Sequence, residues 1–186
     1  MPDPAAPDRN YPALFLALDE VLEALGDGNP DEDALKRAFE SSADGFGAEK
    51  AVLLVVEGGG LRSLASRGLS WEEVAACEKG LSVPGVSSSC IRQALEGKAP
   101  IVVQDPGRML EGKVSEVLTF KPCSVLCAPV CAPRSGDALA VLYFQNEGMR
   151  NAFAEIDRAW IEVFARSLGR AMAWSRRGAA SGGAEG

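Results

Sequence analysis

Residues 123–131 read CSVLCAPVC, and residues 138–144 read ALAVLYF. Pro129 lies inside the first stretch, and a strand is favoured there because proline disrupts the hydrogen bonding of a helix interior. Every residue of the second stretch is hydrophobic, which is typical of a strand in the middle of a sheet that is covered on both faces. The two stretches therefore predict two strands, the second of them central in its sheet.

Three of the five cysteines, Cys123, Cys127 and Cys131, recur at intervals of four along the first of these strands. Four residues of a strand span about 13 Å, whereas a zinc ion holds its sulfur ligands at about 2.3 Å. The spacing therefore predicts thiols that pack in a core as small hydrophobic side chains, and not three ligands of one metal ion. A non-haem iron site built from carboxylates and thiolates stays open as the alternative.

The composition disfavours several classes of function. The chain has 186 residues, a formal net charge of −7 and no histidine. Without histidine it has no Ser–His or Cys–His catalytic pair and no histidine-ligated zinc or haem. The acidic charge disfavours direct binding to nucleic acid or to anionic lipid, and the apolar run at 51–56 is far shorter than the roughly 20 residues of a membrane span. We therefore expect a cytoplasmic protein with reduced thiols, no nucleic-acid partner and no membrane contact.

Periodicity and capping signals divide the chain into a linker at 1–10, one domain at 11–175 and a flexible tail at 176–186. Helices are expected at 11–25, from Asn29 and Pro30 to about Gly45, from Ser70 in a capping box with Glu73, at 87–97 closed by Gly97, and from Ile156 to Met172. Strands are expected at 51–56, after the glycine turn at 58–60, at 101–104, and at the two stretches quoted first.

Three stretches are the most informative within this order of elements: SSSCIRQALEGKAPIVVQDP at 87–106, CSVLCAPV at 123–130 and ALAVLYFQNEGMRNAFAEIDRAWIEVFARSLGRAM at 138–172. With these stretches, the order of the elements resembles a GAF domain over about residues 14–175. The resemblance implies an α+β fold with a central, mainly antiparallel sheet of five or six strands. The terminal helices would cover one face, and the shorter helices with the connector at 107–120 would enclose a ligand pocket on the other.

The resemblance also implies a function. GAF domains of this kind precede output domains in sensor kinases and in transcription regulators that activate the sigma-54 polymerase. We therefore expect a sensory or regulatory module with no catalytic residue and no cofactor, which binds an unidentified small molecule. The residues expected to line its pocket are Ser88, Ser89, Cys90, Arg92, Asp105, Cys123 and Cys127.

Cyclic-nucleotide-binding members carry a motif that this chain matches only in part. Asn146, Phe153 and Asp157 agree with it, but Glu147 stands where the family has a lysine that pairs with the aspartate. Arg158 stands where the family has a glutamate, so Glu147 and Arg158 could form a pair of reversed polarity. We interpret Asn146 and Asp157 as turn and helix-cap residues and expect weak cyclic-nucleotide binding or none.

An enzyme with the same fold provides the alternative function. Free methionine-(R)-sulfoxide reductase is a GAF domain that uses cysteines, one ahead of the helix corresponding to 87–97 and another in the connector. Cys90 lies near the position of the reductase's first catalytic cysteine. The connector at 107–120 has no cysteine, and Cys123 comes only at the start of the strand at 123–131.

The terminal helices are expected to form a homodimer. The C-terminal helix carries a wide apolar surface that includes Trp160, Phe164 and Met172, and the first helix carries a comparable one with Leu14, Leu18 and Leu25. Trp174 adds a further apolar group near the end of the last helix. The two helices could form a four-helix contact across a two-fold axis. The alternative is that both helices only cover their own sheet.

Overall fold

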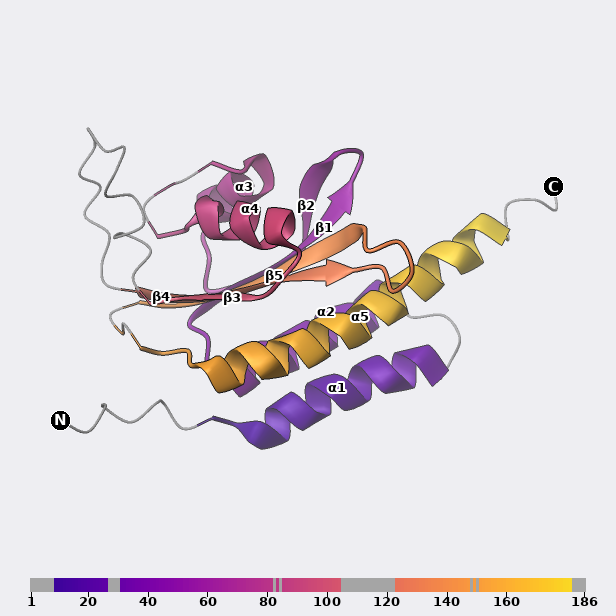
Figure 1. Ribbon diagram of the computed structural model, residues 1–186, viewed down its shortest axis with the longest axis horizontal. Helices are drawn as coiled ribbons and strands as arrows, with labels where there is room; N and C mark the ends of the chain where they lie inside the picture. The colour runs from indigo at the N-terminus through magenta and orange to yellow at the C-terminus, as the bar shows by residue number, and fades with distance from the viewer. Residues whose placement is uncertain are drawn as a thin grey trace.

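The computed structural model describes residues 9–26, 31–81, 83, 85–104, 123–147, 149 and 151–181, with the backbone alone for Cys123 and for 176–181. These residues form an α+β fold around one five-stranded antiparallel sheet in the order β2-β1-β5-β4-β3 (Figure 1). The expected fold class is confirmed. The strands are β1 Lys50–Glu57, β2 Gly60–Arg67, β3 Ile101–Val103, β4 Cys123–Cys131 and β5 Ala138–Glu147.

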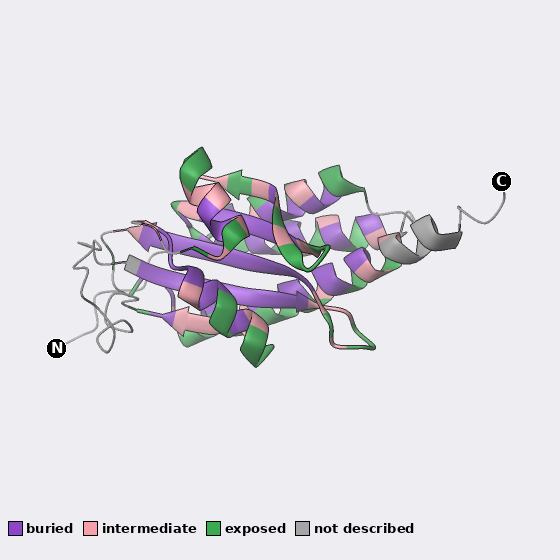
Figure 2. Cartoon of the chain, turned by 90° about the horizontal axis from the view of Figure 1, so that it is seen from above, coloured by how far each residue is buried: buried purple, intermediate pink, exposed green. Residues whose placement is uncertain are grey.

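Strand β5 is the central strand, as its hydrophobic sequence predicts, and it pairs with β1 and β4. Its side chains alternate between two cores: Leu142 and Phe144 point to a larger core, whereas Val141 and Tyr143 point to a smaller one. Strand β4 alternates in the same way, which places Cys127 in the smaller core. Figure 2 shows the middle of the sheet buried and the outer faces of the helices exposed.

Three helices lie on the side of the larger core. Helices α2 (Glu32–Phe46) and α5 (Glu155–Ser181) contact the sheet, and α1 (Tyr11–Gly26) packs on α2 and α5 (Figure 1). A side chain at Gly45 of α2 would overlap Leu14 of α1, so glycine permits the close approach of the two helices. The two terminal helices therefore share one face, as expected, together with α2.

Two shorter helices cover the smaller core, α3 (Trp71–Lys79) and α4 (Ser88–Gly97). The capping box of α3 is confirmed: the Glu73 amide donates to Ser70 Oγ at 3.2 Å, and the Ser70 amide donates to Glu73 Oε2 at 2.7 Å. The end of α4 differs from the expectation, because Gly97 is its last helical residue and Lys98 adopts the left-handed conformation with φ of 48°.

Helix α2 also begins differently from the expectation. Its N-cap is Asp31, whose Oδ1 accepts a hydrogen bond from the Ala34 amide at 2.7 Å. The expected cap at Asn29 and Pro30 falls outside the described residues. Aspartate is as good a cap as asparagine, so the two positions could not be separated by residue type.

The folded part of the chain extends beyond the expected domain bounds of 11 and 175 at both ends. Arg9 packs onto the domain with a side chain that is only 5% exposed, and the backbone of α5 stays helical to Ser181. None of the helices described has the length and apolar character needed to cross a bilayer.

Candidate functional site

The structure brings together several of the residues expected to bind a ligand, near the start of α4. Ser88 and Cys90 are buried there and Ser89 is half-buried, while Cys127 lies on β4 in the same core as Cys90. Arg92 is exposed on α4. Asp105 lies outside the described residues, and Cys123 is described by its backbone alone.

A buried polar network that sequence reasoning missed joins β5 to the segment ahead of α4. The Ser87 amide donates to Tyr143 Oη at 3.1 Å, and Tyr143 Oη donates to Gln145 Oε1. Gln145 Nε2 in turn donates to the Gly85 carbonyl at 2.9 Å. Tyr143 and Gln145 are two residues apart on the strand face that points to the smaller core, and this alternation is the signal that could have identified them.

The thiols beside this network are poor nucleophiles. Burial raises the pKa of Cys77 to about 12, and burial also raises the pKa of Cys90. The pKa of Cys127 lies well above its ordinary value because the thiol is fully buried and has Cys90 and Cys77 as neighbours. The prediction that the thiols of β4 pack in a core is confirmed for Cys127. It is wrong for Cys131, which is half-buried near the end of the strand. Within the described ranges, no three Cys, Asp or Glu side chains are grouped so that they could hold a metal ion.

The partly matched nucleotide motif has a structural role in this protein. Asn146 Oδ1 accepts a hydrogen bond from the Glu49 amide at 2.9 Å, and Asp157 Oδ2 accepts one from the Ala154 amide at 2.7 Å at the start of α5. The interpretation of Asp157 as a helix-cap residue is confirmed. The interpretation of Asn146 as a turn residue is wrong, because Asn146 lies within β5 and pairs with Ser124.

The suggested pair of Glu147 and Arg158 is wrong. Glu147 pairs with Lys50 at 2.5 Å, because it ends β5 beside the start of β1. Arg158 instead pairs with Glu155 one turn earlier on α5, at 3.5 Å. Each charged side chain thus has a closer partner of opposite sign than the one proposed from sequence.

Lys50 bridges two carboxylates from different elements. Its Nζ lies 2.7 Å from Glu73 at the start of α3 and 2.5 Å from Glu147 at the end of β5. Burial alone would lower the pKa of Lys50, but its hydrogen bonds to Glu147 and Glu73 outweigh burial and the pKa is raised. Burial alone would raise the pKa of Glu73, but Lys50 and Ser70 hold it below its ordinary value.

Phe153, two residues ahead of α5, is held by the side chains of Gln104 and Ser124. Gln104 Nε2 donates to the Phe153 carbonyl at 2.6 Å, and Ser124 Oγ accepts a hydrogen bond from the Phe153 amide at 3.4 Å. Ser124 Oγ also donates to Gln104 Oε1 at 3.1 Å. In the sequence, Gln104 and Ser124 flank the segment that contains the expected connector. Both ends of that segment are thereby tied to the base of the C-terminal helix.

The family profile described as GAF domain matches residues 31–172. No curated protein matches the chain. Solved structures match the chain in fold, and the three below have 21% identity or less, so they bear on the fold alone.

The first is the GAF domain of a phosphoenolpyruvate-protein phosphotransferase from Coxiella burnetii, with 21% identity, a TM-score of 0.64, and 92% of this chain and 99% of that chain covered. The second is free methionine-R-sulfoxide reductase from Neisseria meningitidis in complex with its substrate, with 17% identity, a TM-score of 0.59 and 89% of each chain covered. The third is a domain of a two-component sensor histidine kinase protein from Sinorhizobium meliloti 1021, with 19% identity, a TM-score of 0.57, and 82% of this chain and 97% of that chain covered.

Proposed function

The chain belongs to the GAF domain family, and we propose that it is a non-catalytic sensory or regulatory module of the cytoplasm. In this proposal a small molecule binds between the sheet and helices α3 and α4, and the terminal helices carry the signal to an output domain. The output is that of a transcription regulator, of the kind that acts with the sigma-54 polymerase. The similarity of the fold to a domain of a sensor histidine kinase protein supports a signalling role.

The observation that carries the proposal is the contact of Gln104 and Ser124 with Phe153. A molecule that binds beside β3 and β4 and shifts Gln104 or Ser124 would move the Phe153 backbone, and with it the start of α5. Binding on the α4 side would thus change the pose of a helix on the opposite face of the sheet. This route requires only hydrogen bonds that are present in the described residues.

The proposed binding site combines the expected residues with the polar network. Ser88, Ser89 and Cys90 line it from α4, Cys127 from β4, and Arg92, Asp105 and Cys123 complete the set expected from sequence. Tyr143 and Gln145 supply a hydroxyl and an amide from the floor of the sheet. A few polar groups in an apolar surround are typical of small-molecule sites in proteins.

The proposal includes a homodimer, through a surface that differs from the one expected from sequence. Leu14, Phe164 and Met172 are buried in the chain's own core and cannot contact a partner. The apolar side chains that stay exposed on α1 and α5 are Tyr11, Phe15, Leu16, Leu22, Ile156, Val163 and Trp174. We call this set, with the half-buried Trp160, the terminal-helix surface.

Aromatic contacts join the two helices of the terminal-helix surface. The Trp160 ring packs edge-on against Phe15 with a centroid distance of 5.3 Å, and Tyr11 lies 6.2 Å from the same ring. Phe15 nevertheless remains 60% exposed and Ile156 53% exposed. An apolar surface that spans two helices is typical of an interface between subunits.

Methionine sulfoxide reduction is the second candidate, because the fold is shared with a reductase of known activity. Cys90 is the cysteine nearest the expected catalytic place, but it is buried and burial raises the pKa of its thiol. A nucleophilic cysteine requires the opposite, a lowered pKa and access to substrate. The regulatory function is therefore favoured.

Native mass spectrometry tests the proposal of a bound small molecule. Protein that is purified from cells and desalted gently should carry a non-covalent mass that disappears on denaturation and that metabolite extracts restore. Tyr143→Phe, which removes one hydroxyl from the floor of the site, should lower the bound fraction, whereas Arg37→Glu on the exposed face of α2 should not. If the apo mass remains alone after incubation with metabolite extracts, the proposal of a ligand is refuted.

A further inference from the structure

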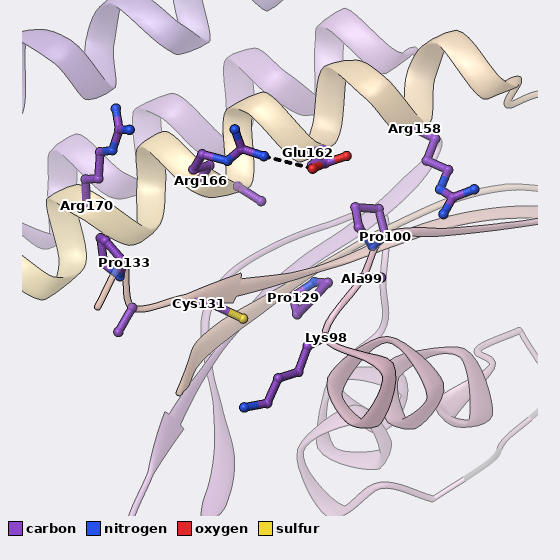
Figure 3. A pocket seen from close by; sticks show the side chains of 12 residues that line it. Lys98, Ala99, Pro100, Pro129, Cys131, Pro133, Arg158, Glu162, Arg166 and Arg170 are labelled. Atoms are coloured by element: carbon purple, nitrogen blue, oxygen red, sulfur yellow. Dashed lines mark hydrogen bonds and ion pairs between the residues drawn. The ribbon is translucent and has the colours of Figure 1, made fainter. Parts of the chain in front are cut away.

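A groove lies between α5 and the edge of the sheet, away from the proposed ligand site (Figure 3). Strand β3 pairs only with Val125–Cys127 of β4, so the rest of that β4 edge has no strand beside it in the described structure. The turn that leads from α4 to β3 runs along this edge instead. The space between the turn, the β4 edge and α5 has a volume of about 420 Å³.

Prolines form much of the floor of the groove. Pro129 lies on β4, Pro100 precedes β3 and Pro133 follows β4, and all three line the space. Proline has no backbone N–H, which explains how this stretch of edge stays free of a strand partner. The floor is thus apolar.

Gly169 brings α5 close to the end of β4 that borders the groove. A side chain at Gly169 would overlap the carbonyl of Cys131, so only glycine permits this approach. The position of α5 over the groove is therefore fixed by direct contact with the sheet.

The rim of the groove is strongly cationic in a chain with a net charge of −7. Lys98, Arg158, Arg166 and Arg170 line it, against the single carboxylate of Glu162. Arg166 pairs with Glu162 at 2.8 Å, and Arg158 pairs with Glu155 at 3.5 Å. Lys98 and Arg170 make no ion pair with any residue that the structure describes. Two cations in the groove thus remain available to an anion.

We propose that this groove binds a small anionic molecule with two or more negative charges, carried by phosphate or carboxylate groups, and an apolar part that rests on the prolines. The Arg guanidinium matches both oxyanions in two-point hydrogen bonds. The volume lies in the range of small-molecule sites, roughly 300–1,000 Å³. This site is separate from the proposed ligand site over the smaller core, so either can exist without the other.

The positions of the cationic side chains also indicate what a bound anion would do. The arginines stand on α5, whereas Lys98 stands on the turn after α4. Figure 3 shows the arginines of α5 on one side of the groove and Lys98 on the other. An anion that reaches from the arginines to Lys98 would connect α5 to the α4 side of the sheet across its edge. Binding should therefore raise the thermal stability of the protein, because a ligand that binds only the folded state stabilises it.

Calorimetric titration of the full chain with inorganic pyrophosphate and with citrate, at low and constant ionic strength, tests the proposal. Saturable one-site binding of either probe is expected, and the probe that binds more tightly identifies phosphate or carboxylate as the preferred group. Arg170→Glu and Lys98→Glu should each weaken binding by about tenfold or more. Neither residue has an ion pair in the described structure, so these changes should leave the fold intact, and circular dichroism checks this.

Arg37→Glu on α2 is the matched control, because it makes the same change of charge on an exposed surface away from the groove. Its affinity should stay within about twofold of the unchanged protein, since a distant surface charge is screened by salt. If neither probe binds at millimolar concentration, or if Arg37→Glu weakens binding as much as Arg170→Glu does, the proposal is overturned.

Discussion

Arg9 and Asp157 form a two-point ion pair, with 2.6 Å between Nε and Oδ1 and 2.6 Å between Nη2 and Oδ2. Their side chains are only 5% and 1% exposed. Arg9 also donates to the backbone carbonyls of Phe46 and Ala152. In cyclic-nucleotide-binding GAF domains, a lysine at the position of Glu147 pairs with the aspartate. Here the cation comes instead from just ahead of α1, so the pair ties the starts of α1 and α5 together.

Removal of Arg9 should strongly destabilise the protein. In Arg9→Ala the carboxylate of Asp157 stays buried without its partner, and loss of one member of a buried ion pair costs about 3–5 kcal/mol. Urea unfolding measures the loss in free energy of unfolding. Arg37→Ala, at an exposed position, should change it by less than about 0.5 kcal/mol. An Arg9→Ala protein as stable as the control would show that the pair does not hold the two helices.

Stability should depend on pH through the ion pair of Lys50 with Glu73. The pKa of Glu73 is lowered in the folded state, so its contribution is complete above its ordinary value of 4.5 and is lost as the pH falls through the lowered pKa. The pKa of Lys50 is raised from 10.5, so its contribution is lost only as the pH rises through that raised value.

Lys50→Met therefore should destabilise the protein by about 1–2 kcal/mol at pH 7, and the difference from the unchanged protein should shrink as the pH falls below 4.5. Chemical denaturation at several pH values measures this. A difference that stays constant from pH 7 down to pH 3 would mean that the ion pairs are not its source.

The thiols should react in two classes. Cys77, Cys90 and Cys127 are buried and their pKa values are raised by burial, so they should resist a thiol reagent at pH 8 until the protein unfolds. Cys131 is half-buried in the groove and should react first among these four. Peptide mass spectrometry after timed labelling identifies the modified residue. Labelling of Cys90 at the rate of Cys131 would contradict the packed core beside α4.

The terminal-helix surface should mediate the proposed homodimer. Phe15→Glu and Val163→Glu place a charge in an apolar contact and should convert the dimer to a monomer at micromolar concentration. Light scattering with size-exclusion chromatography measures the mass. Trp71→Glu on α3, where the side chain is 77% exposed, is the matched control and should leave the dimer intact. A monomer mass for the unchanged protein would refute the dimer.

Much of the fold could be predicted because local signals agree with the tertiary structure. The hydrophobic sequence of β5 indicated its central position, and Ser70 with Glu73 indicated the start of α3. Some predictions were wrong because two residue types suit the same position equally well, as at the N-cap of α2. Other features were missed because the residues in contact are far apart in the sequence. Arg9 and Asp157 are 148 residues apart, and no local pattern indicates their contact.

The candidate site was harder to predict than the fold. The resemblance to GAF domains placed Cys90 and Cys127 on the same side of the sheet, and both lie in the smaller core. Tyr143 and Gln145 were missed, since their hydrogen bonds depend on how the segment ahead of α4 lies over β5. The cationic groove was missed because only the tertiary fold brings Lys98 and Arg170 to the same groove.

The most direct test of the regulatory function is the turnover of free methionine-(R)-sulfoxide with a thioredoxin system as electron donor. The account predicts that the protein reduces the sulfoxide no faster than its Cys90→Ser variant, since the Cys90 thiol is buried and protonated. Cys131→Ser serves as the control for loss of the half-buried thiol. Robust reduction by the unchanged protein, abolished in a folded Cys90→Ser variant and retained in Cys131→Ser, would contradict the account and establish the reductase.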